Sequence, residues 1–332
     1  MHEDLVPPET LEGVSDKEEL EFATEYDVMR GLEDLGHDVR PIGLFDDLGK
    51  LRREIVRWKP NVAFNLLEEF HGVALYDQHV VSFLELMKQP YTGCNPRGLM
   101  LSHDKGLSKQ ILAYHRIPTP KFALFPRGRA IRTPRRLRYP ILVKSSIEEA
   151  SLGISQASIC ATPEKLAERV RFVHEQIETD AIAEEYIEGR ELYVGVLGNQ
   201  RLMTLPIWEM RFTNLPDNVP RIATAKVKWD LEYQKKVGVE TGPARNLPDG
   251  SHERIAKVCK RVYRALSLSG YARMDLRLTP EGDVYVLEAN PNPYLANGED
   301  FAESAWAAGL DYPSLLQKIL TLGMGYQAAW RL

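Results

Sequence analysis

Residues 271–290 read YARMDLRLTPEGDVYVLEAN and carry the strongest structural signal in the chain. Two stretches that alternate apolar and polar side chains flank a TPEGD sequence, which is typical of a turn, so the segment predicts an antiparallel hairpin. We expect Leu278 to pair with Asp283 across that turn. This register places Arg273 opposite Glu288.

One face of the predicted hairpin gathers four polar side chains. Because side chains alternate along a strand, that face holds Arg273, Asp275, Glu288 and Asn290. Carboxylates that cluster in a partly buried place repel one another unless a cation lies among them. Carboxylate and amide oxygens suit Mg²⁺ beside substrate phosphates, so the pattern indicates a magnesium site with an arginine that holds an anion. A solvated surface hairpin is the alternative from these residues alone.

Two further segments place charged groups at the ends of apolar strands. Lys144 ends the stretch YPILVK, and the loop at 145–155 that follows is rich in small residues. Backbone amides of such a loop can approach phosphate oxygens while the lysine supplies a positive charge, although a merely solvated lysine is the alternative. Glu184 and Glu191 flank a corner at Gly189, where carboxylates can bind an adenine amino group and ribose hydroxyls.

In their order along the chain, these motifs resemble the ATP-grasp superfamily, specifically its D-alanine:D-alanine ligase-like branch. The resemblance covers nearly the whole chain and rests on five motifs in the right order, since no single one is decisive. The motifs are Asp104-Lys105, Lys144 with its loop, Glu184 to Glu191, Arg273-Met274-Asp275 and Glu288-Ala289-Asn290.

The resemblance implies an ATP-grasp architecture of mixed α/β and α+β type. An N-terminal, substrate-side lobe with an open parallel sheet would span 1–102, a central lid lobe 103–187, and a C-terminal lobe with the magnesium site 188–332. The last two lobes would clasp ATP. Alternating helix and strand patterns in the first lobe, with strands at 37–44 and 60–66, agree with an α/β sheet. The chain opens on a polar segment, so either this sheet lacks its usual first strand or the natural start lies upstream.

Apolar spacing outlines the remaining elements. A first helix is expected to bury Leu20, Val28, Leu32 and Leu35, and a later one opens at Thr162 with Pro163 in its first turn. Other helices are expected at 51–58, 78–87 and 252–266, and other strands at 121–125, 139–145, 153–160, 191–197, 201–207, 271–278 and 283–290.

The resemblance also implies site residues. Lysines would contact the nucleotide phosphates, Glu184 the adenine and Glu191 the ribose, with the backbone from Glu185 to Ile187 along the adenine edge. The full nucleotide set is Lys105, Lys144, Ser151, Glu184, Glu185, Ile187 and Glu191. The metal ligands would be Asp275, Glu288 and Asn290, for Mg²⁺ or alternatively Mn²⁺.

Two cationic side chains match catalytic residues of the branch. Arg273 matches the arginine that steadies the transferred phosphoryl group, and Lys228, followed by Trp229, resembles a lysine–aromatic pair that closes over the phosphates; Lys226 competes for that role. The implied reaction activates a carboxylate as an acyl phosphate, releases ADP, and lets an amine displace phosphate to form an amide. Such chemistry depends on positioning and electrostatics rather than on a protein nucleophile.

Departures from the branch concern the substrates. A glycine-serine-serine run of the branch reads Glu149-Ala150-Ser151 here, and the segment after Asn290 carries Glu299 and Asp300. These two acids would repel a free carboxylate and favour a cationic amine, unless they cap the helix predicted to follow them. The cluster FNLLEEFHG, with Glu68, Glu69 and His71, is a candidate for the first substrate or a solvated loop.

Composition narrows the class of protein. The 332 residues have a net charge of −5 and a pI near 6.0, which supplies no general attraction for nucleic acid or acidic membrane. Three cysteines without a CxxC pair argue against disulfides and structural zinc, and no apolar run reaches bilayer length, so we expect a cytoplasmic protein. Small-molecule carboxylate and amine substrates are the expected partners, and a homodimer is left open.

Other functions compete with this interpretation. A ligase that adds amino acids to a peptide or protein tail is one, because the basic loop at 127–138 could dock an acidic tail. A regulatory protein that binds nucleotide without turnover is another. The presence of all the expected phosphate and metal residues disfavours the second.

Overall fold

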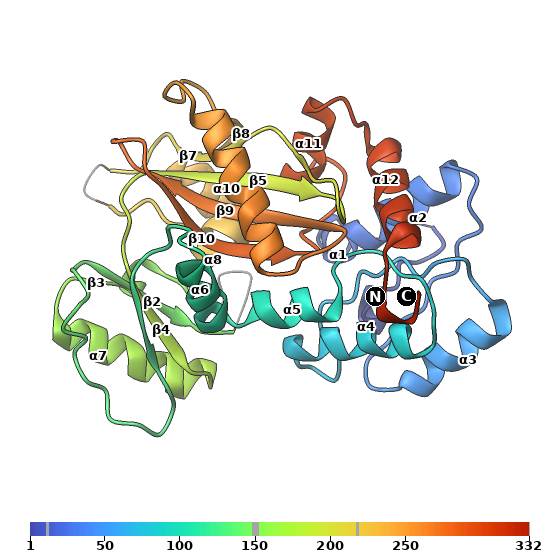
Figure 1. The fold of residues 1–332 in the computed structure, drawn as a ribbon, viewed down its shortest axis with the longest axis horizontal. Helices are drawn as coiled ribbons and strands as arrows, with labels where there is room; N and C mark the ends of the chain where they lie inside the picture. The colour runs from blue at the N-terminus through green and yellow to red at the C-terminus, as the bar shows by residue number, and fades with distance from the viewer. Residues whose placement is uncertain (11–12, 148–152, 217–218, 332) are drawn as a thin grey trace.

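The computed structural model describes residues 1–10, 13–147, 153–216 and 219–331, and its fold is built around two antiparallel sheets (Figure 1). A four-stranded sheet has the order β1-β4-β2-β3, and a six-stranded sheet has the order β10-β9-β5-β7-β8 with β6 paired to β5. The small sheet and the N-terminal helices lie at opposite sides of the molecule, with the large sheet between them and above.

The small sheet comprises β1 (Phe122–Phe125), β2 (Ile141–Ser145), β3 (Ile159–Cys160) and β4 (Ala181–Glu185). Helix α7 (Pro163–Phe172) packs on it through Leu166 and Val170, which are fully buried. As predicted, the Thr162 hydroxyl accepts a hydrogen bond from the backbone of the first turn. The predicted strand at 153–160 forms only at its end, after a short 3-10 turn.

In the large sheet, β5, β9 and the edge strand β10 have eight residues each, and the other strands are shorter. Helix α10 (Ser251–Ala265) lies across one face (Figure 1), and its Ile255 and Val262 join Met274 and Leu276 of the sheet in one buried cluster. The helix predicted at 252–266 and the strands predicted at 191–197 and 271–278 are confirmed. The strands are β5 (Arg190–Leu197), β6 (Met203–Thr204), β7 (Trp208–Phe212), β8 (Val239–Pro243), β9 (Tyr271–Leu278) and β10 (Val284–Pro291).

The N-terminal region is helical where the structure describes it, and the predicted open parallel sheet does not form as strands there. The segments at 37–44 and 60–66 run extended, and the bridges that they make, His2 to Leu44 and Ala63 to Tyr91, are single and parallel. Prolines limit this pairing, because Pro41 lies within one segment, Pro60 opens the other and Pro90 precedes Tyr91, and none of them has an N–H to donate to a ladder. The helices are α1 (Asp16–Glu21), α2 (Ala23–Asp34), α3 (Leu48–Trp58), α4 (Asp77–Leu86), α5 (Pro96–His103) and α6 (Lys105–Tyr114).

The first predicted helix is divided in two at Phe22, and only part of its expected stripe is buried. Val28 and Leu32 are buried, whereas Leu20 is 60% exposed and Leu35 36% exposed. The break turns α1 away from the register of α2, so Leu20 leaves the buried side. Val28 and Leu32 pack in the same cluster as the C-terminal helices, which return to this part of the molecule (Figure 1): α11 (Asp300–Ala307) and α12 (Tyr312–Gly325).

Short elements complete the description. Helices α8 (Ala225–Trp229) and α9 (Leu231–Val237) connect β7 to β8. Within the described residues, no helix combines the length and the apolar character needed to cross a membrane. The 3-10 and π turns are Glu3–Leu5, Ala74–Tyr76, Gln156–Ser158, Val173–Ile177 and Ala329–Arg331.

Candidate active site

The β9–β10 hairpin differs in register from the sequence prediction. Leu278 pairs with Val284 rather than with Asp283, and the register shifts between Val286 and Glu288. As a result Glu288 lies opposite Asp275, and the predicted pairing of Glu288 with Arg273 is wrong. The difference has two parts: the turn pairs Leu278 one residue further along β10 than predicted, and one extra residue in β10, a bulge that alternation in the sequence does not reveal, adds a second step.

The predicted shared face is nevertheless present. Asn290 lies opposite Arg273, and Glu288 opposite Asp275, so all four side chains project from one side of the antiparallel pair. Arg273 holds Asp275 in a two-pronged ion pair, with Nε to Oδ1 at 2.7 Å and Nη2 to Oδ2 at 2.9 Å. Its guanidinium also lies 4.8 Å from the ring centre of Tyr193.

The pKa values of the two carboxylates on this face shift in opposite directions. Burial raises the pKa of Asp275, the Arg273 charge works against that rise, and the negative Glu288 adds to it. Burial would also raise the pKa of Glu288, but nearby lysine charges outweigh it and hold the pKa well below its usual range. Those lysines are Lys144, Lys105, Lys228 and Lys109.

A row of buried charges crosses from the hairpin to the small sheet. Lys144 of β2 lies 3.4 Å from Glu288 Oε2 and 3.4 Å from Glu184 Oε1, and Lys109 of α6 lies 3.2 Å from Glu184 Oε2. Burial would lower the pKa of Lys144, yet the two carboxylates outweigh it and raise the pKa above its usual range. The signs alternate along the row, which lets four charges share a site with little water.

The lysines predicted at the phosphates converge on this row. Lys105 is the first residue of α6, and Asp104 caps that helix by accepting the Leu107 amide at 2.8 Å. Lys228 of α8 adds to the lowering of the Glu288 pKa and opposes the rise of the Asp275 pKa, so its charge lies near both carboxylates. The competing Lys226 instead lies 6.0 Å from the ring centre of Tyr233. This geometry favours Lys228 for the catalytic role.

The predicted ribose carboxylate has two buried partners that sequence reasoning missed. Glu191 accepts hydrogen bonds from Arg277 at 2.7 Å and from the Tyr193 hydroxyl at 2.9 Å. Arg277 also donates to the carbonyls of Gly189 and Arg221. Both unpredicted residues lie on strands at two-residue spacing from predicted ones, but nothing in one sequence marks them as site residues.

The predicted adenine edge is the connection between β4 and β5. Glu185 turns its side chain outward, where Oε1 accepts the Arg138 amide at 2.9 Å, and Ile187 is half-buried in the connection. Ser151, the remaining predicted nucleotide residue, lies outside the described residues, as do Glu149 and Ala150.

Near Arg273, acidic side chains outnumber basic ones. Glu299 occupies the position before α11 but makes no side-chain cap hydrogen bond, and Asp300 is in the first turn. Burial raises the pKa of Glu299, Asp300 raises it further, and Arg273 opposes both. The two acids therefore lie within electrostatic reach of the hairpin face. They also occupy the start of α11, where the alternative of a helix-terminal role places them, although the Glu299 side chain makes no cap hydrogen bond.

The acidic cluster of the N-terminal region divides in two. His71 stacks on Phe45 with ring centres 5.8 Å apart, and Glu69 approaches His2 at 3.5 Å, so these side chains belong to a local contact near the first residues. Glu68 instead affects β9. Burial is the main cause of the raised pKa of Tyr271, and the negative charge of Glu68 raises that pKa further. Of the three predicted residues, Glu68 is the one with an observed influence on β9.

The donor set of the hairpin fits a hard divalent ion. Asp275 and Glu288 offer carboxylate oxygens, and the Asn290 amide has a buried nitrogen atom without a hydrogen-bond partner. In the described ranges, no group of three or more His, Cys, Asp or Glu side chains could hold a metal. A set of two carboxylates and one amide suits Mg²⁺, which keeps water and phosphate oxygens as further ligands.

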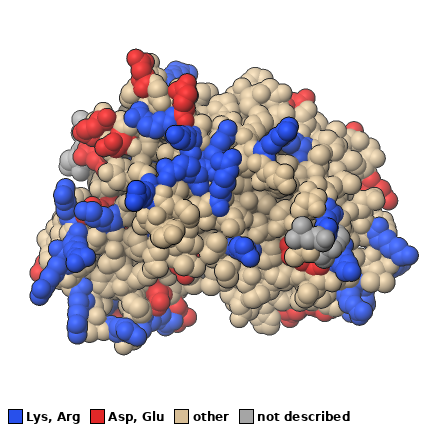
Figure 2. Space-filling view, viewed as in Figure 1, with Lys and Arg blue, Asp and Glu red and all other residues tan. Residues whose placement is uncertain are grey.

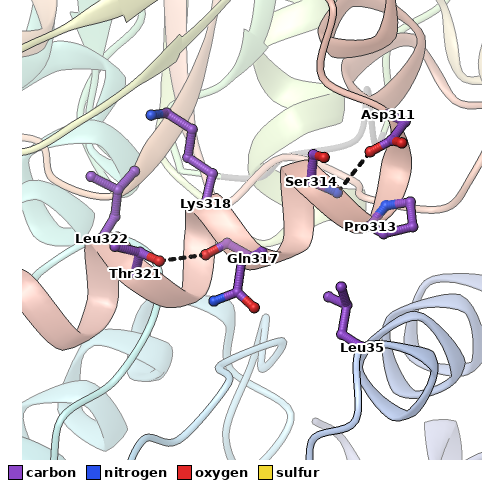
Figure 3. Close-up of a pocket in the computed structure, with 8 residues that line it drawn as sticks. All are labelled: Leu35, Asp311, Pro313, Ser314, Gln317, Lys318, Thr321 and Leu322. Atoms are coloured by element: carbon purple, nitrogen blue, oxygen red, sulfur yellow. Dashed lines mark hydrogen bonds between the residues drawn. The ribbon is translucent and has the colours of Figure 1, made fainter.

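Neither surface charge nor surface hollows locate this site. Lys and Arg side chains gather over the face that α10 occupies (Figure 2), whereas Lys105, Lys109 and Lys144 are each less than a tenth exposed. A hollow of about 430 Å³ lies between α2 and α12 (Figure 3), and neither of the hairpin carboxylates lines it. Its lining includes Leu35, Gln317 and Lys318, without a cluster of acids or bases suited to catalysis.

Comparisons with known proteins agree with this geometry. Residues 111–321 match a family model described as "D-ala D-ala ligase C-terminus". The chain is 33% identical over 263 residues to y4sG of Sinorhizobium fredii, a protein described as uncharacterized, with 78% of this chain and 73% of the relative covered. It is 30% identical over 265 residues to a D-alanine–D-alanine ligase of Desulfotalea psychrophila, covering 79% and 78% of the two chains.

Solved structures show the same fold. The D-alanine–D-alanine ligase from Bacillus anthracis, complexed with ATP, superposes with a TM-score of 0.73 at 24% identity, over 94% of this chain and 95% of that one. The VanG D-Ala:D-Ser ligase from Enterococcus faecalis gives a TM-score of 0.69 at 20% identity, over 93% and 96%. The ATP-grasp architecture expected for this chain is thus shown at the level of the whole fold.

Proposed function

Because the chain belongs to the D-alanine–D-alanine ligase family, we propose that it joins a carboxylate to an amine in an ATP-dependent reaction that proceeds through an acyl phosphate. The enzyme is an ATP-grasp ligase of this family's type. The observation that carries the finer proposal is the hairpin face, where Arg273, Asp275 and Glu288 meet Lys144 from the other sheet.

The proposed reaction has two bond-forming steps. A carboxylate oxygen of the first substrate attacks the γ-phosphorus of ATP, and the bond to ADP breaks. The amine nitrogen of the second substrate then attacks the acyl carbon, phosphate leaves with the bonding electron pair, and the amine loses a proton. No protein nucleophile is needed, since positioning and charge stabilisation carry such transfers.

Each proposed residue has a defined task in these steps. Lys105, Lys144 and Lys228 offset negative charge on the phosphates, and Arg273 steadies the transferred phosphoryl group. Asp275, Glu288 and Asn290 would hold Mg²⁺, which when bound supplies positive charge to the phosphate oxygens. Mn²⁺ is a second ion that the same oxygen donors accept.

The nucleoside would lie between the two sheets. We assign Glu184 to the adenine amino group, Glu191 to the ribose, and the chain from Glu185 to Ile187 to the adenine edge, with Ser151 on the loop beside the phosphates. The lobes proposed to surround it are 103–187 and 188–332, with 1–102 on the substrate side. The small sheet, which lies below the large one in Figure 1, is the part that we propose to act as a lid over the nucleotide.

The acceptor is proposed to be an amine that carries no free carboxylate or that bears an added positive charge. Glu299 and Asp300 place negative charge near Arg273, and Glu299 makes no cap hydrogen bond that would account for it. The matched folds include a D-Ala:D-Ser ligase beside D-alanine–D-alanine ligases, so the same fold accommodates different second substrates.

The test is a substrate matrix. Purified protein would be incubated with ATP, Mg²⁺ and pairs of carboxylates and amines, with ADP release and product mass read in the same reaction. We expect ADP release that depends on both substrates and a product whose mass equals their sum less one water. Failure of every carboxylate–amine pair to release ADP, with nucleotide bound, would contradict the proposed reaction.

A further inference from the structure

Lys109 is a buried lysine to which none of the roles above is assigned. It lies one turn after Lys105 in α6 and is 1% exposed. Its ammonium group contacts Oε2 of Glu184 at 3.2 Å, the Thr119 hydroxyl at 3.1 Å and the Leu287 carbonyl at 2.8 Å. A lysine has three N–H donors, so each of them has an acceptor here.

These three contacts connect separate parts of the molecule. Glu184 belongs to β4 of the small sheet, Thr119 lies between α6 and β1, and Leu287 is the extra residue of the β10 bulge. The Thr119 hydroxyl in turn donates to the Val286 carbonyl at 2.9 Å. Lys109 therefore fixes the bulge that sets the register of the following residue, Glu288, against Asp275.

The contact with Glu184 matters most when Lys144 changes partners. In this structure the Lys144 ammonium lies 3.4 Å from both Glu184 and Glu288, which is longer than a typical charge-assisted hydrogen bond. A lysine in that position can turn toward nucleotide phosphates. Once it does, Lys109 is the cation that still holds Glu184, whose side chain is only 2% exposed.

We propose that Lys109 is a positioning residue that gives the ligase its preference for adenine nucleotides by holding the Glu184 carboxylate oriented toward the base. The inference rests on the proposed function. Adenine presents an amino donor where guanine presents a carbonyl oxygen, so a fixed carboxylate attracts the first base and repels the second. A carboxylate free to turn away would discriminate less.

The test measures nucleotide binding directly. Dissociation constants for non-hydrolysable ATP and GTP analogues with Mg²⁺ would be determined by calorimetry for the wild-type chain and for Lys109→Met. We expect the ATP analogue to bind about tenfold more weakly to the variant and the GTP analogue to change far less, because one charge-held hydrogen bond to the base is lost. Equal weakening of both analogues, which a general structural defect produces, would overturn the inference.

Two further variants distinguish a lost orientation of Glu184 from a general folding defect. In a Glu184→Gln background, adding Lys109→Met should have little further effect on ATP selectivity, because the carboxylate that it orients is gone. If Lys109→Met does not fold, Thr119→Val removes one anchor of the same ammonium group and should shift selectivity in the same direction by a smaller factor. Lys165→Met, on the exposed side of α7, is the matched control and should bind as the wild type does.

The outcomes separate the two claims. A wild-type chain that binds no nucleotide would overturn the proposed function and this inference together. A wild-type chain that prefers the ATP analogue, with unchanged preference in both Lys109→Met and Thr119→Val, would overturn the inference alone.

Discussion

The two sides of the hairpin face differ in how their charges are balanced. Toward the small sheet, lysines and glutamates alternate in one buried row, from Lys109 through Glu184 and Lys144 to Glu288. Toward α11, Arg273 is shared between its ion-pair partner Asp275 and the nearby acids of the helix start. One side is compensated before any ligand arrives, and the other has surplus negative charge.

This difference separates what the family shares from what this chain has changed. The compensated side holds Lys144, Glu184 and Glu288, which the resemblance assigns to the nucleotide and the metal, whereas the proposed metal ligand Asp275 lies beside Arg273. The surplus acids of the negative side follow Asn290, where the sequence departs from the pattern that the resemblance implies. We infer that the nucleotide chemistry is retained while the second substrate differs, and each prediction below tests one side of this contrast.

The largest effect is expected at the metal-side carboxylates. Asp275→Asn or Glu288→Gln should lower Mg²⁺-dependent ADP release by about a thousandfold or more, because each removes a ligand and a charge that the transferred phosphate requires. The fold should persist because the isosteric amide keeps the packing, but stability should fall, since each change removes one partner of an ion pair, Arg273–Asp275 or Lys144–Glu288. Steady-state ADP assays with circular dichroism would check both statements. Full activity in either variant would disprove the metal assignment, and Glu168→Gln on the surface of α7 serves as the control.

Breaking the buried pair at the ribose side should affect stability. Arg277→Met leaves Glu191 buried with only the Tyr193 hydroxyl as partner, and a buried charge that loses its counter-ion costs about 3–5 kcal/mol. Urea unfolding followed by fluorescence measures the change. The double variant Arg277→Met/Glu191→Gln should recover part of the loss, and a loss below about 1 kcal/mol in the single variant would show that the pair is solvent-screened.

The negative side is tested by the choice of acceptor. D-Alanine should be a poor second substrate, and Glu299→Gln/Asp300→Asn should shift preference toward carboxylate-bearing amines by about tenfold, because two repulsive charges are removed. Product ratios by mass spectrometry at equal acceptor concentrations report the shift. Efficient D-alanyl-D-alanine synthesis by the wild type would refute the proposal, and unchanged preference in the variant would favour a helix-terminal role for both acids.

The smallest effect concerns closure over the nucleotide. Hydrogen exchange in α8 (Ala225–Trp229), which carries Lys228, should slow by about tenfold when ATP and Mg²⁺ are added. Exchange in α10, far from the phosphates, is the internal reference. Equal exchange in α8 with and without nucleotide would contradict a closing lid.

Sequence reasoning succeeded where a local pattern was enough. Strand alternation predicted the shared face of Asp275 and Glu288, and capping residues predicted the start of α7 at Pro163. It failed where the answer depended on distant contacts. The hairpin register was wrong by one residue at the turn, where Leu278 pairs with Val284, and by a second residue at the bulge, where the Leu287 carbonyl accepts a hydrogen bond from Lys109 of a helix far away in the sequence.

The N-terminal region shows a second kind of failure. The apolar stretches at 37–44 and 60–66 have the composition of strands, but the described chain pairs each of them through a single bridge. Prolines limit the ladder, and the side chains of Val39, Val62 and Phe64 instead pack against the cluster that contains α12. Propensity favoured strands, and the available partners decided against them.

The sequence by itself determined the chemistry of this protein: the order of the charged motifs, the alternating face of two carboxylates and an amide, and the acids that follow Asn290. These are local properties, because residue type and a period of two specify them without reference to the rest of the chain. The tertiary structure alone decided which charges compensate one another. The row from Lys109 to Glu288 joins a helix and two sheets. The interaction energy of such charges depends on the distance to their nearest partners and on the exclusion of water, which folding sets. Folding therefore turned separate motifs into a balanced nucleotide side and an acidic acceptor side.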